Sequence, residues 1–354
     1  IDGQTRSNPP TIGADEIMMN GPGNNLAVLS ILQPTIAGFS PGLQPIKALI
    51  RNLGNNSVTN FKLKYTVNGG APVTLSFTGN LAPCDTITMT FSGANQYNFP
   101  GGATFLKVFV DTVNSVRDSV NSNDTAYLTV CSPLGGSYTV NGALGLTATN
   151  FQTFSQLASA LNSCGVFANV NVNVAPGTYI DNVAFGAIPG NDTTKRIVID
   201  GGNPILSILK RRTFNNSINY VVRFDKTNDI ELRNLTIQSD SNSIGSIIQA
   251  MGGDRLKIKR CILEYTGAAA TANNGNLKLI HISASGSNSA STSATYTRVE
   301  IDSNIINNGY NALDANFTSY TNLLYMRYNI INNPSYCGIY STSNGTFKII
   351  GNLI

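Results

Sequence analysis

Apolar and polar residues alternate in seven short runs between residues 26 and 130, and turn-forming residues separate the runs. The runs are LAVLSIL (26–32), IKALIRN (46–52), FKLKYTV (61–67), PVTLSF (72–77), TITMTF (86–91), TFLKVFVD (104–111) and TAYLTV (125–130). Alternation of this kind is typical of a strand with one buried face. Seven such strands at this spacing predict an immunoglobulin-like β-sandwich over residues 22–132.

A helical spacing follows in the segment NFQTFSQLASALNSCG, residues 150–165. Its apolar residues recur every third or fourth position, at Phe151, Phe154, Leu157, Ala158 and Leu161. This predicts one short helix over 151–164, ended by Gly165.

Beyond about residue 169 one eight-residue pattern returns five times. Its first, third and eighth positions are apolar, and the copies are IELRNLTI (230–237), LKIKRCIL (256–263), VEIDSNII (299–306), LYMRYNII (324–331) and FKIIGNLI (347–354). A second apolar run lies between the copies, at 244–250, 277–283, 310–315 and 337–342. A period in the twenties with two or three strands per turn is typical of a solenoid. We therefore predict an all-β chain whose residues 133–354 form a parallel β-helix, right-handed by the crossover rule, with the helix at 151–164 as its N-terminal cap.

The sixth position of the pattern changes its chemistry along the chain. It holds Leu235, Cys261, Asn304, Asn329 and Asn352. Coils of such a fold lie about 4.8 Å apart, so equivalent side chains stack. A buried amide is costly unless it is hydrogen-bonded, and stacked asparagines can bond to one another. We predict a structural asparagine ladder at Asn304, Asn329 and Asn352.

Two other positions of the pattern are expected to face outward. One column runs Glu231, Lys257, Glu300, Tyr325, Lys348, and the other runs Arg233, Lys259, Asp302, Arg327, Ile350. Asp302 is expected to pair with Lys259 and Arg327 on the adjacent coils. Such pairs contribute about 0.2–1 kcal/mol each and help to fix the register.

Composition narrows the class of protein. Charged residues make up 12% of the chain and the formal net charge is +4, without a Lys/Arg block of the kind that binds nucleic acid. The sequence has no run of 18 apolar residues for a membrane span. With a single histidine a zinc site is not expected, and no cofactor site is predicted. A chain with little charge and many Asn, Ser and Thr residues is expected to be extracellular.

Five cysteines bear on this expectation. Cys131 and Cys164 lie at the two ends of the entry to the predicted β-helix, and a disulfide between them would clamp the capping helix with about 3–4 kcal/mol. Two buried thiols are the alternative. Cys261 is expected to be core packing, and a bond between Cys261 and Cys337 is not expected, because they lie on different sheets.

Particular segments resemble known families. NNLAVLSI, IRNLGNNSV, YTVNGG and VDTVNSVRDSVNSNDTAYLTV resemble the CARDB family of adhesion-related Ig-like domains over about 23–131. IDGQTRSNPPTIGADE resembles the closing segment of β-helix domains in large secreted Bacteroidetes proteins, and GGSYTVNGALG with the segment after it resembles the opening of another. The resemblance implies that residues 1–21 are the tail of a preceding β-helix, in a type IX-exported surface adhesin. The chain is expected to continue beyond Ile354, because its last coil has an open edge.

Candidate chemistry is sparse. Glu300 and Asp302 share a face and Asp314 is expected on the neighbouring one, but no catalytic residue is assigned, because basic partners are expected for both carboxylates. His281 is expected to be an ordinary strand residue. Asp111, Asp118 and Asp124 could hold Ca²⁺, with a solvated turn as the alternative. The tripeptides at 85–87, 111–113, 118–120, 124–126 and 192–194 resemble the Bacteroidetes O-glycosylation sequon, which implies modification at Thr86, Thr112, Ser119, Thr125 and Thr193.

The resulting hypothesis is a non-enzymatic structural segment of an extracellular adhesin or appendage. Its partners would be flanking domains, copies of itself, or a cell-surface or polysaccharide ligand contacted by the loops 266–276 and 283–297. One alternative is a polysaccharide-binding or pectinase-like β-helix. Another is a self-assembling fibre subunit with Tyr325 and Ile350 at its interface.

Overall fold

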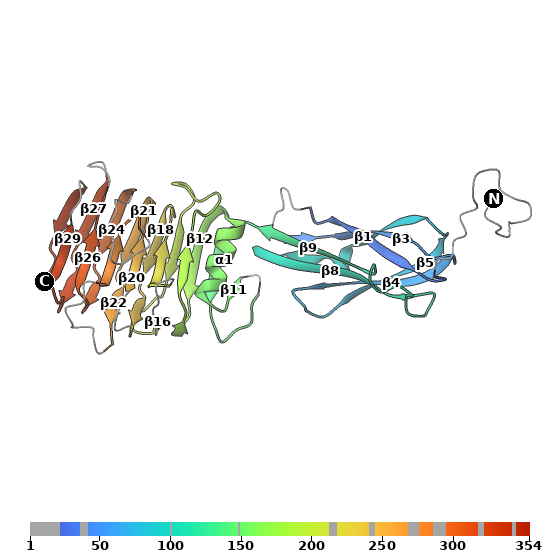
Figure 1. The fold of residues 1–354 in the computed structure, drawn as a ribbon, viewed down its shortest axis with the longest axis horizontal. Coiled ribbons are helices and arrows are strands. Elements are labelled where there is room, and N and C mark those ends of the chain that lie inside the picture. Colours follow the sequence, from blue (N-terminus) through green and yellow to red (C-terminus); the bar gives the residue numbers. More distant parts are fainter. Residues whose placement is uncertain are drawn as a thin grey trace, which may run out of the picture. The chain divides into compact units, whose positions relative to one another are not determined.

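The computed structural model describes residues 22–35, 42–99, 101–147, 149–211, 218–240, 245–267, 276–285, 295–317, 322–341 and 345–354. The chain divides into two compact units, unit 1 (Ile1–Phe99 and Thr104–Val130) and unit 2 (Pro100–Ala103 and Cys131–Ile354) (Figure 1). The expected β-helix tail at 1–21 lies outside the described residues, as do residues 268–275 and 286–294 of the two expected contact loops.

Unit 1 consists of antiparallel strands, and each of the seven runs of alternating residues falls on a strand, apart from Pro72 at the start of the fourth run. Its elements are β1 (Leu26–Gln33), β2 (Gly42–Gln44), β3 (Ile46–Asn52), β4 (Val58–Val67), β5 (Val73–Leu81), β6 (Thr86–Phe91), the 3₁₀ turn η1 (Gly93–Asn95), β7 (Tyr97–Phe99), β8 (Gly102–Val113) and β9 (Thr125–Ser132). They form sheets in the orders β1-β3-β6 and β5-β4-β8-β9, and β2 pairs with β7. Apolar faces such as those of Ile50, Leu63 and Val108 are buried together, as alternation requires.

Unit 2 contains three sheets that the chain visits in turn. The first is β10 (Leu134–Val140), β11 (Asn150–Phe151), β12 (Val166–Val174), β15 (Ile197–Asp200), β18 (Ile230–Arg233), β21 (Gly253–Lys259), β24 (Tyr296–Asp302), β27 (Leu323–Arg327) and β30 (Thr346–Ile350). The second is β13 (Gly177–Ile180), β16 (Ser207–Arg211), β19 (Thr236–Ser239), β22 (Ile262–Tyr265), β25 (Ile305–Asn307) and β28 (Ile330–Asn332). The third is β14 (Val183–Phe185), β17 (Tyr220–Phe224), β20 (Gly245–Ala250), β23 (Leu277–Ile282), β26 (Asn311–Ala315) and β29 (Cys337–Ser341).

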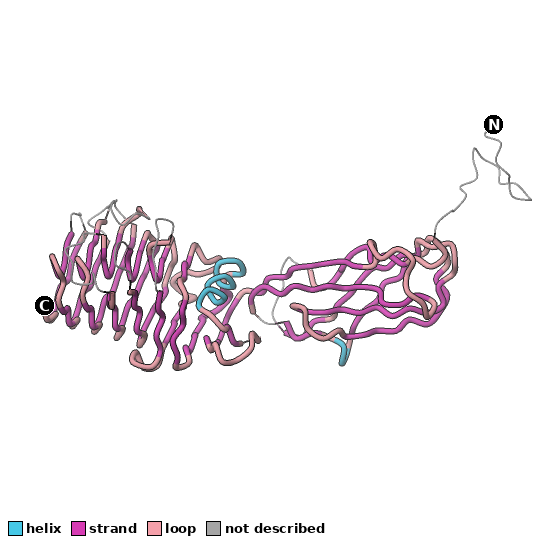
Figure 2. Tube along the Cα trace, turned by 60° about the horizontal axis from the view of Figure 1, so that its bottom comes forward, coloured by secondary structure: helices cyan, strands magenta, loops and turns pink. Residues whose placement is uncertain are grey.

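Strands of equivalent position pair in parallel from coil to coil, and the result is a β-helix-like stack (Figure 2). The five pattern copies are in register: Leu256 pairs with Ile230 and Val299, and Leu324 pairs with Val299 and Phe347. Apolar residues of all three sheets belong to one continuous core. The eight-residue pattern therefore describes a first-sheet strand, a corner and the start of a second-sheet strand.

This corner is tight and has the same backbone each time. Arg260, Ser303, Tyr328 and Gly351 have φ of 50°, 57°, 56° and 62°, in the left-handed region that L-residues rarely occupy. A sharp turn between two strands needs such a residue, and Gly351 adopts it without a Cβ penalty. Each of these residues comes directly before the sixth position of the pattern.

The α-helix of the described residues, α1 (Phe154–Cys164), begins three residues later than the expected start at 151. Thr153 is its N-cap, and its Oγ1 accepts a hydrogen bond from the Gln156 N–H at 3.1 Å. Phe151 lies instead in β11, which pairs with β10. Phe154, Leu157 and Leu161 are buried in the core of unit 2, so the helix covers the end of that core. Cys131 and Cys164 form a disulfide with their Cα atoms 5.1 Å apart.

The three asparagines of the corner column are hydrogen-bonded to one another. Asn304 Nδ2 donates to Asn329 Oδ1 at 2.9 Å, and Asn329 Nδ2 donates to Asn352 Oδ1 at 2.8 Å. Each amide also bonds the main chain of the preceding coil: the N–H groups of Cys261, Asn304 and Asn329 donate to the Oδ1 of the next asparagine, and the Nδ2 groups donate to the carbonyls of Ile258, Ile301 and Met326. Asn304 and Asn329 are fully buried, so these bonds replace those that water would make.

We predict that Asn329→Ala lowers the free energy of unfolding of unit 2 by about 2–4 kcal/mol, because it leaves buried donors and acceptors on both neighbouring coils unpaired. Asn332→Ala is the matched control. It removes an exposed Asn332–Asn307 bond on the second sheet and should cost less than about 0.5 kcal/mol. Urea denaturation measures both, and equal losses for the two variants would contradict the ladder's role.

Candidate functional site

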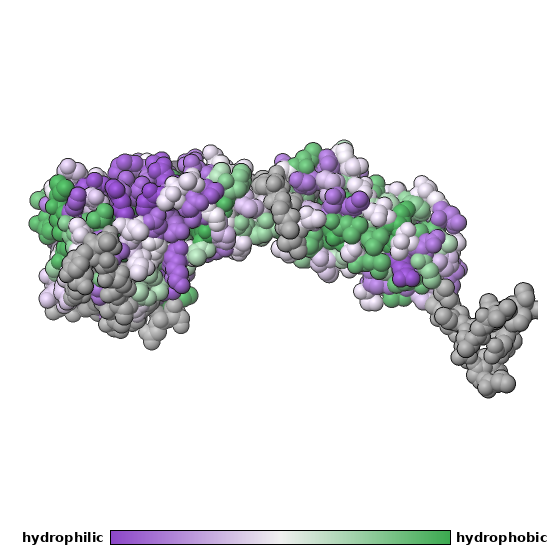
Figure 3. All heavy atoms as spheres, turned by 90° about the horizontal axis from the view of Figure 1, so that it is seen from above, coloured by the Kyte–Doolittle hydropathy of each residue, from purple (hydrophilic) through white to green (hydrophobic). Residues whose placement is uncertain are grey.

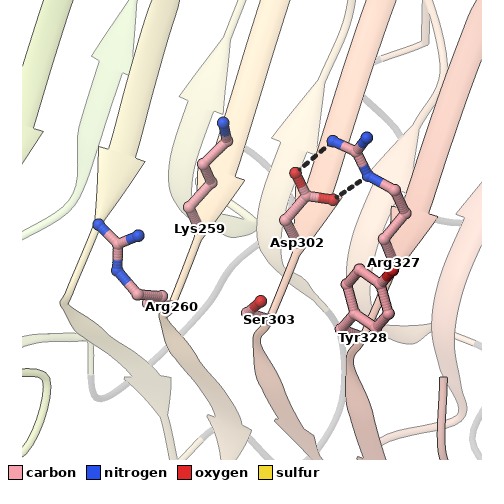
Figure 4. A pocket seen from close by; sticks show the side chains of 6 residues that line it. All are labelled: Lys259, Arg260, Asp302, Ser303, Arg327 and Tyr328. Carbon is pink, nitrogen blue, oxygen red and sulfur yellow. Dashed lines mark hydrogen bonds and ion pairs between the residues drawn. The ribbon is translucent and has the colours of Figure 1, made fainter. Parts of the chain in front are cut away.

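A pocket of about 290 Å³ opens at the corner between the first and second sheets of unit 2. It is lined by the last strand residue and the left-handed corner residue of three successive coils: Lys259 and Arg260, Asp302 and Ser303, Arg327 and Tyr328 (Figure 4). Arg260, Ser303 and Tyr328 are exposed, because a left-handed corner residue points its side chain away from the core.

Among the described residues, Asp302 forms an ion pair with Arg327 alone. Arg327 binds it with two hydrogen bonds, Nε to Oδ1 at 2.8 Å and Nη2 to Oδ2 at 2.6 Å. This bond raises the pKa of the Arg327 guanidinium above its ordinary value. Bidentate arginine–carboxylate pairs of this kind are stronger than hydrogen bonds between neutral groups.

Lys259 has a different partner from the expected one. Its Nζ lies 3.4 Å from Glu300 Oε2, and no ion pair joins it to Asp302 among the described residues. The longer reach of Glu300 explains this, since Asp302 is already turned toward Arg327 (Figure 4). Glu300 also contacts Arg298 at 2.8 Å and Arg327 at 3.3 Å. It is only 6% exposed, and the three cations around it compensate for its burial.

Tyr325 is surrounded by two of these cations and by a third, Lys348. Arg298, Arg327 and Lys348 lie 4.6, 5.1 and 5.4 Å from its ring centroid. The ring of Tyr325 is half-buried, whereas Ile350 is exposed. The cationic side chains that stack on Tyr325 cover its ring.

Positive charge exceeds negative charge in the pocket itself. Three cations and one carboxylate line it, and Arg327 neutralises that carboxylate. Arg260 Nε donates to the neutral Asn234 Oδ1 at 2.9 Å, and its side chain makes no ion pair among the described residues. Figure 3 shows hydrophilic side chains gathered in a band along one face of unit 2. The corner is therefore suited to an anionic group, which Arg260 and Lys259 could contact from one side.

Several charges on the coils before Asp302 are also paired. Arg233 bonds Asp200 at 2.8 Å and contacts Glu231 at 3.4 Å, and Arg255 contacts Asp229 at 3.1 Å. Burial alone would raise the pKa of Asp200, but bonds from Asn234, Gly202 and Arg233 lower it below its ordinary value. The two outward charged columns were predicted from their position in the repeat. The corner residues that line the pocket were not predicted, although each of them directly precedes the sixth position of the repeat.

Asp314 lies on a different sheet from Glu300 and Asp302. It is on β26 of the third sheet, buried, with Lys278 Nζ 2.8 Å from its Oδ2. His281 is also buried there, on β23, which fits its expected place within a strand. Burial, together with the neighbouring Lys278 cation, lowers the pKa of His281 to about 4, although Asp314 opposes the shift.

The three calcium candidates are not gathered into a site. Asp111 pairs with Lys64 at 2.9 Å, whereas Asp118 accepts bonds from the main-chain N–H groups of Leu26 and Val120 at 2.6 and 2.8 Å. Across the described part of the chain, no group of three His, Cys, Asp or Glu residues is arranged to hold a metal ion. Burial raises the pKa of Asp124 to about 6, and the Asp118 carboxylate adds to the rise.

The candidate glycosylation residues differ in their exposure. Thr86, Ser119 and Thr193 are exposed, whereas Thr112 and Thr125 are half-buried. Cys84, Cys261 and Cys337 are free thiols. Cys261 is buried in the core below the ladder, and this burial raises its pKa to about 12, as expected of a packing residue. None of the helices described is both long and apolar enough to cross a membrane.

Comparison with known proteins identifies part of the chain. Residues 24–127 match the CARDB family model, so unit 1 carries a CARDB Ig-like domain. No curated protein matches the chain.

Two similar solved structures are a solution NMR structure and a crystal structure of the CARDB domain of the PF1109 protein from Pyrococcus furiosus, the latter in complex with di-metal ions. The first is 23% identical, covers 32% of this chain and 97% of its own, and has a TM-score of 0.26. The second is 22% identical, covers 34% and 99%, and has a TM-score of 0.25.

The raised pKa of Asp124 predicts a pH dependence for unit 1. Because about 6 in the folded state lies above the ordinary 3.8, the folded chain holds this proton more tightly. Its stabilising contribution is present below about pH 4 and is lost as the pH rises through about 6. Asp124→Asn should therefore raise the melting temperature of unit 1 at neutral pH relative to the native chain and flatten its decline with pH, as followed by calorimetry. Asp111→Asn is the control, and identical pH profiles for all three chains would contradict the assignment.

Proposed function

We propose that this chain is a non-enzymatic structural segment of a large extracellular adhesin or surface appendage, of the type IX-exported kind found in Bacteroidetes. In this proposal unit 2 is a right-handed parallel β-helix and the CARDB domain is a spacer. The observation that carries it is the unbroken register from β12 to β30, in which each coil hydrogen-bonds the next over a continuous core. Such a stack is a stiff rod whose strength grows with the number of coils.

Two further observations support this role. The disulfide between Cys131 and Cys164 is of a kind that persists outside the cell. Glu300 and Asp302, the carboxylates that a hydrolase would need free, are each bound to arginine. A carboxylate neutralised in this way is a poor nucleophile and a poor general acid.

The test combines adhesion with turnover. Cells that display the full chain should resist detachment under flow better than cells that display only its CARDB domain, because the rod provides both reach and contact area. The purified chain should release no products from pectin, alginate or sulfated polysaccharides. Product formation that disappears in Glu300→Gln would overturn the non-enzymatic assignment.

The corner pocket supports a second candidate, binding of an acidic polysaccharide through its carboxylate or sulfate groups. We expect Arg260→Ala to weaken binding of a sulfated or uronate polysaccharide at least about fivefold, because a charge-assisted hydrogen bond is lost. Arg117→Ala is the matched control, since Arg117 is an exposed arginine that also donates to an asparagine, at 3.2 Å. Calorimetric titration at two salt concentrations measures the effect. Equal affinity for a neutral glucan, or an equal loss in the control, would count against this candidate.

A further inference from the structure

A lysine, an asparagine and an aspartate are buried together on the third sheet of unit 2. Lys278 lies on β23, and Asn311 and Asp314 lie on β26; they are 6%, 3% and 4% exposed. Lysine and aspartate are almost never fully buried unless they are paired. Here the ion pair between Lys278 and Asp314 joins strands β23 and β26, which belong to consecutive coils and pair with each other.

The register places the lysine directly opposite the asparagine. Lys278 and Asn311 are cross-strand partners, and adjacent parallel strands lie only about 4.8 Å apart. Asp314 contacts both side chains through one oxygen: Lys278 Nζ is 2.8 Å from its Oδ2, and Asn311 Nδ2 donates to the same Oδ2 at 3.5 Å. The amine and the carboxamide are therefore held against one carboxylate.

The remaining contacts leave the carboxamide available. Asn311 Oδ1 is buried and accepts no hydrogen bond from the described residues. Lys278 Nζ lies 3.5 Å from His281 Nε2, and burial keeps this imidazole neutral at ordinary pH, with its pKa lowered to about 4. The Lys278 ammonium and the Asp314 carboxylate therefore face each other in a buried site, and neither forms another ion pair among the described residues. In such a site, moving a proton from the first to the second removes both charges.

We propose that Lys278 and Asn311 are joined by a covalent amide bond, formed by the protein itself with Asp314 as the proton-transferring catalytic residue. Lys278 gives a proton to Asp314 and becomes a neutral amine, the form in which a lysine is a nucleophile. Its Nζ attacks Asn311 Cγ, and a tetrahedral intermediate forms.

The proton balance closes within the cluster. Asp314 relays the proton that the attacking Nζ loses to the departing Nδ2, so the Cγ–Nδ2 bond breaks as ammonia forms. The proton first taken from Lys278 leaves with the ammonia as ammonium, and Asp314 returns to its carboxylate. An ammonium and a carboxamide thus become a secondary amide and ammonium, without an oxidant or any other reactant. The register holds Lys278 opposite Asn311, and one oxygen of Asp314 contacts both nitrogens between which the proton must pass.

Mass spectrometry tests the bond directly on the full chain, purified from a host without protein glycosylation and reduced before measurement. The native chain should be lighter than its sequence mass by one ammonia, about 17 Da. Trypsin should fail to cut after Lys278, and fragmentation should find the peptides of Lys278 and Asn311 joined. A native chain with its full sequence mass, or one that has lost water through a Lys278–Asp314 link, would overturn the proposal.

Three variants assign the roles. Lys278→Met and Asn311→Ala should have their full sequence masses, and so should Asp314→Ala, in which both reacting groups remain. Asn332→Ala is the matched control and should still lose one ammonia. Circular dichroism on each variant shows whether the strands have formed. An ammonia loss that persists in a folded Asp314→Ala variant would overturn the catalytic role of that residue, and one that persists in Asn311→Ala would overturn the bond itself.

Discussion

Coil-to-coil register is the constraint on which the rest of unit 2 depends. Parallel pairing places each residue against its equivalent in the next coil, as with Leu256 and Val299, so one choice of residue is repeated many times. An aliphatic residue repeated in this way extends the core. A buried amide repeated in this way finds its hydrogen-bonding partners in the coils before and after it, as Asn329 does. A shift of one residue would bury the charged column and expose the aliphatic one.

The same constraint organises the charged face. Glu300 would be costly if it were buried alone, yet the register brings cations from both neighbouring coils within reach of it. These contacts use the carboxylates, and they leave Arg260 at the corner without a carboxylate partner among the described residues. The paired charges on the strands and the unpaired positive charge at the corner therefore have the same cause. The side chain of the corner residue Arg260 points away from the strand columns, where the carboxylates lie.

Much of this could be read from the sequence, because period and position are properties of the chain itself. The strands of the sandwich, the solenoid repeat and the ladder column all follow from spacing. The features that could not be predicted depend on how side chains meet in the folded structure. Lys259 reaches Glu300 rather than the directly opposed Asp302, since Arg327 already occupies Asp302. The helix starts at Phe154 because Thr153 caps it, although Phe151 continues the apolar spacing. The cluster of Lys278, Asn311 and Asp314 on the third sheet does not recur from coil to coil, so no repeat in the sequence predicts it.

Two ways of burying polar groups therefore coexist in the stacked coils of unit 2. In the ladder, each amide bonds its neighbours and the main chain, and nothing is left over for chemistry. In the third sheet, the polar column Arg223, Gln249, His281, Asp314 changes its residue at every coil, and Asn311 Oδ1 and His281 Nδ1 have no partners among the described residues. A repeated residue satisfies its own hydrogen bonds. Two columns of unlike residues instead bring acid, amine and amide together, with Asp314 from one column and Lys278 and Asn311 from the other. In stacked coils, side chains that can react with one another are therefore expected at positions where the residue changes from coil to coil. Lys278, Asn311 and Asp314 occupy such positions.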